Sequence, residues 1–387
     1  MTYTPPQVLD QGAFGETITA DLDPFFQHTF AYSTISISDE IFTKTTAGSG
    51  TVGQADGKLI VKTGTTTGST AVAETRKFIK YNAGQGITFR AAGFFVSPTA
   101  GTTQEVGCGD DTNGFFFEYD GTTFGINRRS DGTDNQVTQA NWNLDKADGN
   151  GVLPAITNWT KGIPFQIRFQ FLGMGTITWY VENPETGVFV PVHAEQYANS
   201  ATVPSVLNPS FPARVAVDNG ATTTDVGVRI SSIAAFNEGK IKWTGPIFGT
   251  VGTETVTTTE SVISIRNPST VDSVTNRGLI KIIRGELVTD GTKTVTFIGY
   301  RDATLTGTTS FASIASGRSF AEIDVSSGVT VSGGIPIAAS VVAKADSVPI
   351  NFDEDYFIIY PGETWTFTAQ SSASNDVGVA LTWQENP

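Results

Sequence analysis

Two stretches of the sequence place carboxylates at alternate positions: Glu118-Tyr119-Asp120 and Glu322-Ile323-Asp324. In a β-strand such positions share one face, and glycoside hydrolysis requires an acid and a base or nucleophile about 5–10 Å apart. The strand pattern Glu-x-Asp-x-x-Glu would supply both groups, but Thr123 and Ser327 stand where the last Glu is needed. Asp120 also begins an Asp-Gly pair, which is a hairpin-turn signal in its own right. We therefore expect no catalytic residues and no enzymatic activity.

The two histidines form no recognisable nucleophile–base motif. His28 lies near the N-terminus and His193 ends a predicted strand, and neither has Ser, Cys or a second His at motif spacing. The Gly-x-Ser-x-Gly sequence that positions a nucleophilic serine is also missing. Because the members of a triad meet in space rather than in sequence, a triad stays an alternative. We expect His193 to be a structural or interface residue.

The stretch between Trp142 and Gly151 is rich in the hard oxygen ligands that calcium prefers. Its candidates are Asn143, Asp145, Asp148 and Asn150. The spacing does not fit an EF-hand, and Asx residues beside glycine are also common turn-formers. Calcium is therefore the one cofactor that the sequence suggests, with a turn as the alternative explanation. A second acidic turn contains Asp110, Asp111 and Asn113, and calcium binding and turn formation are again the two interpretations.

Aromatic side chains on an exposed face or loop could stack on sugar rings. The candidates are Tyr119, Trp142 and Trp159, with Phe124 and Tyr197 as further possibilities. Most aromatic residues of a phenylalanine-rich β-sandwich belong to the core, so burial is the alternative for each of them.

Composition and charge exclude several classes of protein. The 387 residues include 41 Gly and 26 Phe and carry a net charge of −14, which argues against binding to nucleic-acid phosphates. Cys108 is the single cysteine, so no intrachain disulfide is expected. No stretch approaches the ~18 apolar residues of a membrane span, and the N-terminus lacks the basic and apolar regions of a secretory signal. We expect a soluble protein made in a cytoplasm, with no membrane partner.

The segment from Ile163 to His193 predicts a three-strand antiparallel meander. Phe165, Ile167 and Phe169 alternate with polar residues, and short turns rich in Gly, Asn and Pro separate two further alternating runs. Such a period of two is typical of strands with one buried face. Many short strands without helical periodicity predict an all-β protein with antiparallel, jelly-roll-like β-sandwiches.

We predict three parts of the chain. Residues 1–35 show no convincing period and are expected to form an extended N-terminal arm, residues 36–236 a lectin-like β-sandwich domain and residues 237–387 a C-terminal β-sandwich domain. Disordered segments are usually poor in aromatic residues, so the arm is expected to pack on a neighbouring molecule. The residues that would anchor it are Phe14, Phe25, Phe26 and Phe30.

Several motifs in the predicted first domain resemble a module of structural proteins from tailed phages and other large DNA viruses. The resemblance covers roughly residues 40 to 235 and includes the position of His193 and Asn199. Its motifs are Tyr81–Gly86, Gly101–Gly107, Asp110–Phe117, Tyr119–Ile126 and Trp142–Lys146.

The resemblance implies a virion protein on the particle exterior: a capsid decoration, or a head, neck or tail-fibre component. Such proteins are commonly trimeric, so the implied partners are further copies of the chain and other capsid, neck or tail proteins. The family brings no established catalytic residues. We therefore expect a non-enzymatic virion structural protein, made in the host cytoplasm and anchored by its arm. The alternative is an adhesin that binds host-surface glycans through loops of the first domain.

Overall fold

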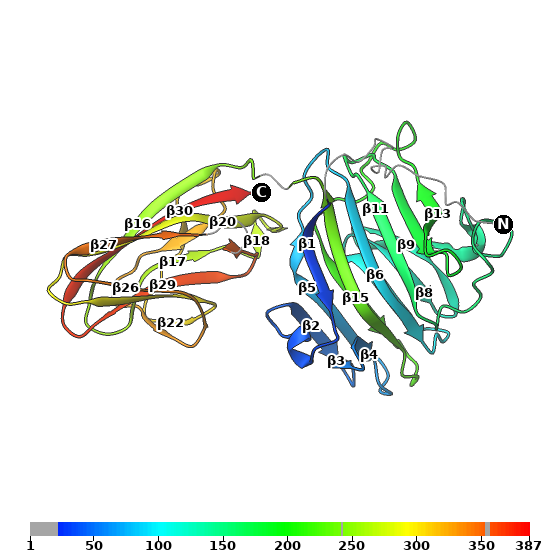
Figure 1. Cartoon of the computed structure of the whole chain (residues 1–387), viewed down its shortest axis with the longest axis horizontal. Helices are drawn as coiled ribbons and strands as arrows, with labels where there is room; N and C mark the ends of the chain where they lie inside the picture. The colour runs from blue at the N-terminus through cyan, green and yellow to red at the C-terminus, as the bar shows by residue number, and fades with distance from the viewer. Residues whose placement is uncertain (1–21, 241–242, 353–356) are drawn as a thin grey trace. The chain divides into compact units, whose positions relative to one another are not determined.

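The computed structural model describes residues 22–240, 243–352 and 357–387. The chain divides into two compact units, Met1–Ile241 and Lys242–Pro387, which are described separately below (Figure 1). The boundary that we predicted after residue 236 falls within the last strand of unit 1. In the described ranges the helical segments are two short 3₁₀ turns, η1 (Thr34–Ile37) and η2 (Gln139–Asn141), and no helix there is long and apolar enough to cross a membrane. The all-β prediction is confirmed.

Unit 1 is a sandwich of two antiparallel sheets, named here after a central strand of each. The β6 sheet has the order β13-β12-β11-β6-β15-β4-β3, and β1 pairs with β15 as well. The β8 sheet has the order β10-β9-β8-β7-β14-β5-β2. The strands of the β6 sheet are β1 (Leu22–Thr29), β3 (Thr51–Ala55), β4 (Lys58–Lys62), β6 (Ile87–Val96), β11 (Ile163–Phe169), β12 (Ile177–Glu182), β13 (Phe189–Glu195) and β15 (Gly227–Glu238). Those of the β8 sheet are β2 (Phe42–Ala47), β5 (Thr70–Ile79), β7 (Thr103–Gly109), β8 (Gly114–Asp120), β9 (Thr123–Ser130), β10 (Thr133–Thr138) and β14 (Phe211–Asp218).

The core of unit 1 lies between these two sheets. The predicted meander is confirmed as β11, β12 and β13, paired in sequence order. Its buried rings meet those of the opposite sheet: Phe165 lies 4.6 Å from Phe117 and Phe169 lies 5.0 Å from Phe115, between ring centroids. Aromatic pairs at such distances contribute about 0.5–1.5 kcal/mol each beyond the area that they bury.

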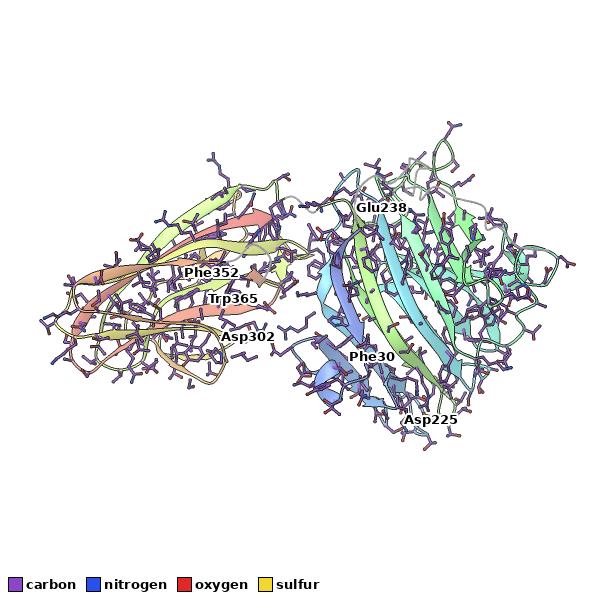
Figure 2. The ribbon with its side chains drawn as sticks, in the orientation of Figure 1. Phe30, Asp225, Glu238, Asp302, Phe352 and Trp365 are labelled. Atoms are coloured by element: carbon purple, nitrogen blue, oxygen red, sulfur yellow. The ribbon has the colours of Figure 1, made fainter. Side chains whose placement is uncertain are left out.

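The prediction of an N-terminal arm packed on another molecule is wrong for the described part of that segment. β1 pairs with β15, from Leu22 opposite Glu238 to Thr29 opposite Ser232. Phe26 and Phe30 are buried in the core of unit 1, Phe25 packs against that core, and Phe14 lies outside the described residues (Phe30 and Glu238 are labelled in Figure 2). A bulge between Pro24 and Phe26 interrupts the alternation, which is why no period was visible in the sequence.

Unit 2 is a second antiparallel sandwich. Its β20 sheet has the order β16-β30-β20-β27, with β28 also paired to β20, and its β29 sheet has the order β22-β25-β17-β29-β21-β26, extended by β23 and β24. The β20 sheet comprises β16 (Ile247–Val256), β20 (Leu279–Thr289), β27 (Asp346–Asn351), β28 (Ile358–Ile359) and β30 (Asn375–Asn386). The β29 sheet comprises β17 (Glu260–Arg266), β21 (Val295–Arg301), β22 (Thr304–Thr306), β23 (Ala312–Ser313), β24 (Glu322–Asp324), β25 (Thr330–Ser332), β26 (Ile335–Val342) and β29 (Thr364–Ser371), and a separate ribbon comprises β18 (Thr270–Val271) and β19 (Val274–Thr275).

The core of unit 2 contains branched residues and a few large rings. Phe352 and Trp365 belong to it (Figure 2), and the buried Trp383 donates its indole N–H to Glu385 at 2.9 Å. Along β30, alternate residues are buried and partly exposed, as a strand covered on one side requires.

Candidate functional site

The side of the β8 sheet that faces away from the core carries a layer of charged and amide side chains. Alternation along β8 buries Phe115, Phe117 and Tyr119 between the sheets and turns Phe116 and Glu118 to the other side. Strand register then adds polar residues from five more strands. We call this set the polar face; it consists of Glu74, Glu105, Glu118, Asn127, Arg129, Asp134, Gln136 and Arg214.

Two arginines hold Glu105 at the centre of the polar face. Arg214 donates from Nε to Oε1 of Glu105 at 2.6 Å, and Arg129 donates from Nη2 to Oε2 at 2.9 Å. Burial is the largest single influence and would lower the pKa of each arginine, but the charges and hydrogen bonds of Glu105 and the neighbouring carboxylates together outweigh it and raise the pKa. Arg214 also pairs with Glu74 and, at 2.5 Å, with Asp111. Both oxygens of Glu105 are thus occupied by cations.

Glu118 lies directly opposite Glu105 in the β7–β8 pairing. Its oxygens accept from neutral amides: Oε2 from Asn127 at 2.7 Å and Oε1 from Gln136 at 3.1 Å. Burial, and next the negative charge of Glu105, raise the pKa of Glu118 to about 8. The protonated form of Glu118 is therefore favoured at neutral pH, because a second buried charge beside a carboxylate is unfavourable.

The accessible rim of the polar face differs from its centre. The Asp134 side chain is 51% exposed and that of Asp111 is 85% exposed, against 4% for Glu105. Asp134 is nonetheless fixed, because its Oδ1 accepts from Arg129 Nε at 2.7 Å and from Asn127 Nδ2 at 2.8 Å. Its Oδ2 has a long 3.5 Å contact with Arg129, so this oxygen of the half-exposed side chain keeps the capacity to accept a further hydrogen bond.

A carboxylate pair with one proton is what acid–base chemistry on a glycosidic bond requires. This pair does not have the access that such chemistry needs, because Glu105 and Glu118 are both buried. The two arginines also occupy both oxygens of Glu105. The geometry favours a pair that orders the polar face and presents its rim to a ligand.

Glu105 was not among the residues singled out from the sequence, because Glu118 was considered only together with residues that follow it in the chain. The signal was available, because the predicted strands Gln104–Cys108 and Gly114–Tyr119 flank a short turn. Pairing of Gly109 with Gly114 across that turn sets Glu105 opposite Glu118.

The predicted sugar-stacking residues are buried, so that prediction is wrong. Tyr119 is 7% exposed, and Trp142 and Trp159 are each 1% exposed. The loop that contains the two tryptophans folds back onto the sandwich, where Trp159 stacks on Phe124 at 4.2 Å between ring centroids. The indole N–H of Trp159 donates to Gln139 at 3.0 Å. Large rings with their polar atoms satisfied gain more by filling the core than by facing water.

Three of the predicted calcium ligands form hydrogen bonds within the protein. Asp145 accepts backbone N–H groups from Ala147, Val152 and Leu153, at 2.7 to 3.0 Å. The side chain of Asn143 exchanges two hydrogen bonds with the backbone of Ala194 on the edge strand β13, and Asp148 accepts from the backbone of Asn150. In the described ranges no group of three or more His, Cys, Asp or Glu is placed to hold a metal ion. Side-chain oxygens of Asn143, Asp145 and Asp148 are thus engaged in hydrogen bonds within the protein.

His193, the other residue considered for chemistry, contacts the same loop. Its Nδ1 accepts the backbone N–H of Asn143 at 3.3 Å, and its ring lies 5.9 Å from that of Trp179. Burial lowers the pKa of His193. These contacts give the histidine a structural role in holding the loop against β13.

No protein-family profile matches the chain, and no curated protein matches it either. Solved structures with a similar fold include peanut lectin with a 9mer peptide (11% identity, TM-score 0.36) and the legume lectin-like domain from Entamoeba histolytica (9%, 0.35). Each match covers 56% of this chain and 98% of the other. A glycoside hydrolase family protein from Mycobacterium thermorestibile matches at 15% identity and a TM-score of 0.38, over 55% of this chain and 100% of the other. The antiparallel β-sandwich fold itself rests on the strand pairing of this chain.

Proposed function

We propose that the chain is a carbohydrate-binding protein without catalytic activity, and that unit 1 binds a glycan at the rim of the polar face. The observation that carries the proposal is the half-exposed carboxylate of Asp134: Arg129 and Asn127 fix one of its oxygens, and the other makes a long 3.5 Å contact with Arg129. Sugar hydroxyls donate and accept hydrogen bonds, so a carboxylate beside the amide of Gln136 offers them both kinds of partner. These side chains are already ordered, so binding loses little side-chain entropy.

Absence of catalysis is part of the proposal. Its support is the closed environment of Glu105 and Glu118, whose four oxygens all accept hydrogen bonds from neighbouring side chains. A glycosidic oxygen would have to displace Asn127 or Gln136 to reach Glu118. We expect bound glycan to be recovered intact, with no release of reducing ends.

The place of action is a second part of the proposal. We infer that the glycan belongs to a host surface and that the chain acts on a virion exterior as a homotrimer, next to capsid, neck or tail proteins. The support is the sequence resemblance, whose motifs include Asp110–Phe117 and Tyr119–Ile126. Antibody labelling of intact particles with imaging tests this placement; particles that lack the protein would overturn it and would leave glycan binding untouched.

A glycan array probed with the full chain tests the binding proposal. We expect saturable binding that Asp134→Asn weakens about tenfold, since a hydrogen bond to a charged group contributes roughly 1.5–3 kcal/mol. Glu185→Gln is the matched control, because it makes the same carboxylate-to-amide change at an exposed turn of the opposite sheet. An array without binding, or equal binding by the Asp134 variant, would overturn the proposal.

A further inference from the structure

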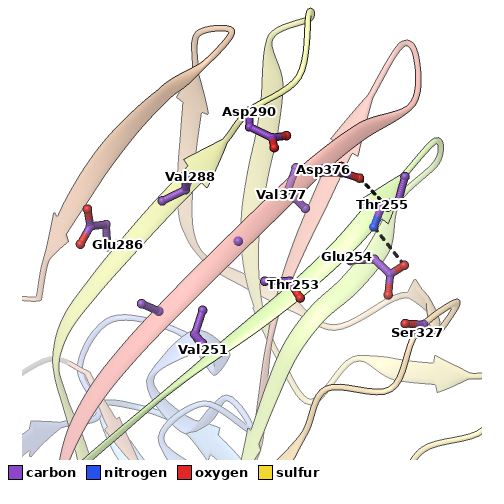
Figure 3. Close-up of a pocket in the computed structure, with 12 residues that line it drawn as sticks. Val251, Thr253, Glu254, Thr255, Glu286, Val288, Asp290, Ser327, Asp376 and Val377 are labelled. Atoms are coloured by element: carbon purple, nitrogen blue, oxygen red, sulfur yellow. Dashed lines mark hydrogen bonds between the residues drawn. The ribbon is translucent and has the colours of Figure 1, made fainter.

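The outer face of the β20 sheet in unit 2 contains a trough. Alternation along β30 directs Val377, Val379 and Leu381 into the core and leaves Gly378 and Ala380 on the outer face. Strand register places Thr253 and Val288 on either side of Gly378, and Val251 and Glu286 on either side of Ala380. A floor of one hydrogen atom and one methyl group thus lies between two walls of larger side chains (Figure 3).

The size of the trough suits an extended polypeptide. Neighbouring strands lie about 4.8 Å apart, so β16 and β20 stand about 10 Å apart across β30. The cavity has a volume of about 740 Å³. Its walls are apolar in the middle, where Val251 is 59% and Val288 is 40% exposed, so a ligand that covers them removes apolar surface from water.

The charged side chains that line the trough are all acidic. Glu254, Asp290 and Asp376 lie toward one end and Glu286 stands on the β20 wall, while no lysine or arginine lines the cavity (Figure 3). Thr255 fixes two of these carboxylates, by donating its hydroxyl to Asp376 at 2.5 Å and its backbone N–H to Glu254 at 3.1 Å. Glu286 pairs with the exposed Arg284 at 3.7 Å, and such exposed pairs contribute little.

We propose that this trough is a docking site for an extended segment of a partner protein that carries lysine or arginine. The apolar stem of such a side chain would lie on Gly378 and Ala380 between the valines, with its charged end among the carboxylates. The carboxylates that line the trough repel phosphate-rich ligands. A glycan would find no aromatic side chain among the lining residues.

Two kinds of variant test the site in the full chain. Gly378→Leu fills the floor, and it is compatible with folding because a Cβ there meets no atom closer than 3.8 Å. Asp290→Asn combined with Asp376→Asn removes two of the four negative charges with little change of shape. Gly53→Leu is the matched control, since a Cβ at this glycine of β3 meets no atom within 4 Å.

The probe is a short fluorescent peptide in which lysine alternates with valine, and its anisotropy reports binding. We expect saturable binding that both kinds of variant weaken at least tenfold, that Gly53→Leu leaves unchanged, and that about 0.5 M salt weakens because ions screen the carboxylates. The proposal is overturned if a matched peptide with glutamate in place of lysine binds equally, or if the trough variants bind like the parent protein. Equal competition by free spermine would also overturn it, since a small cation would then be a sufficient ligand.

Discussion

Replacing Glu118 with glutamine tests the charge distribution that we assign to the polar face. In the fold the pKa of Glu118 is raised from its usual 4.5 to about 8, first by burial and then by the charge of Glu105. Folding therefore favours the protonated side chain. The stability that Glu118 contributes is fully present below about pH 4.5 and is lost as pH rises toward 8.

The size of the effect follows from the two pKa values. Each pH unit between them changes the free energy of unfolding by about 1.4 kcal/mol, so the full loss is on the order of 5 kcal/mol. This is a large fraction of the roughly 5–15 kcal/mol that stabilises a typical domain. Glutamine has nearly the same shape but does not ionise, and Gln136 can rotate its amide so that its oxygen meets the new N–H group.

The assay is denaturant unfolding at a series of pH values, followed by tryptophan fluorescence. The transition of unit 1 is expected to weaken between pH 5 and 8 in the parent protein and to change less in Glu118→Gln, so that the variant becomes the more stable protein at pH 9. The difference in free energy of unfolding between the two proteins at each pH cancels the contribution of groups that titrate in both, such as His28 and His193. Glu185→Gln, at an exposed turn, should follow the parent curve. Parallel curves for the parent and Glu118→Gln would show that Glu118 is ionised in the fold and would refute the assignment.

Two further predictions concern stability, and calorimetry of the full chain checks both. Phe30→Ala should lower the free energy of unfolding of unit 1 by about 3–5 kcal/mol, because a fully buried ring is replaced by a cavity. An unchanged transition of unit 1 would show that residue 30 lies outside the core. The transition of unit 2 serves as the internal control. Arg214→Met should cost about 3–5 kcal/mol by leaving Glu105 and Glu74 with fewer cationic partners. Adding Glu105→Gln should restore part of that loss, and no restoration would count against the pairing.

Much of the fold could be predicted from local sequence patterns. The alternation of Phe165, Ile167 and Phe169 identified β11 with the correct face buried, because a strand sends successive side chains to opposite sides whatever its neighbours are. The Asp120-Gly121 pair likewise marked the hairpin between β8 and β9. Turn chemistry and alternation depend on residues a few positions apart, so they can be read without the tertiary structure.

The candidate sites could not be predicted in this way. Trp142 and Trp159 were predicted at a surface, and only the path of their loop decided that they are buried. Phe26 and Phe30 were assigned to an arm, because pairing of β1 with β15, about 200 residues later in the chain, is not visible in either segment alone. The resemblance to virion proteins rests on motifs that form turns and strands. Such motifs say more about the fold than about the function.

The composition and periodicity of the sequence by themselves determined an acidic, all-β protein with sandwich cores. Tertiary structure alone decided that Glu105 lies opposite Glu118, and that Gly378 of β30 lies between Thr253 of β16 and Val288 of β20. The physical reason is that strand propensity arises within a strand, whereas the proton of Glu118 and the shape of the trough depend on side chains that only strand pairing brings together.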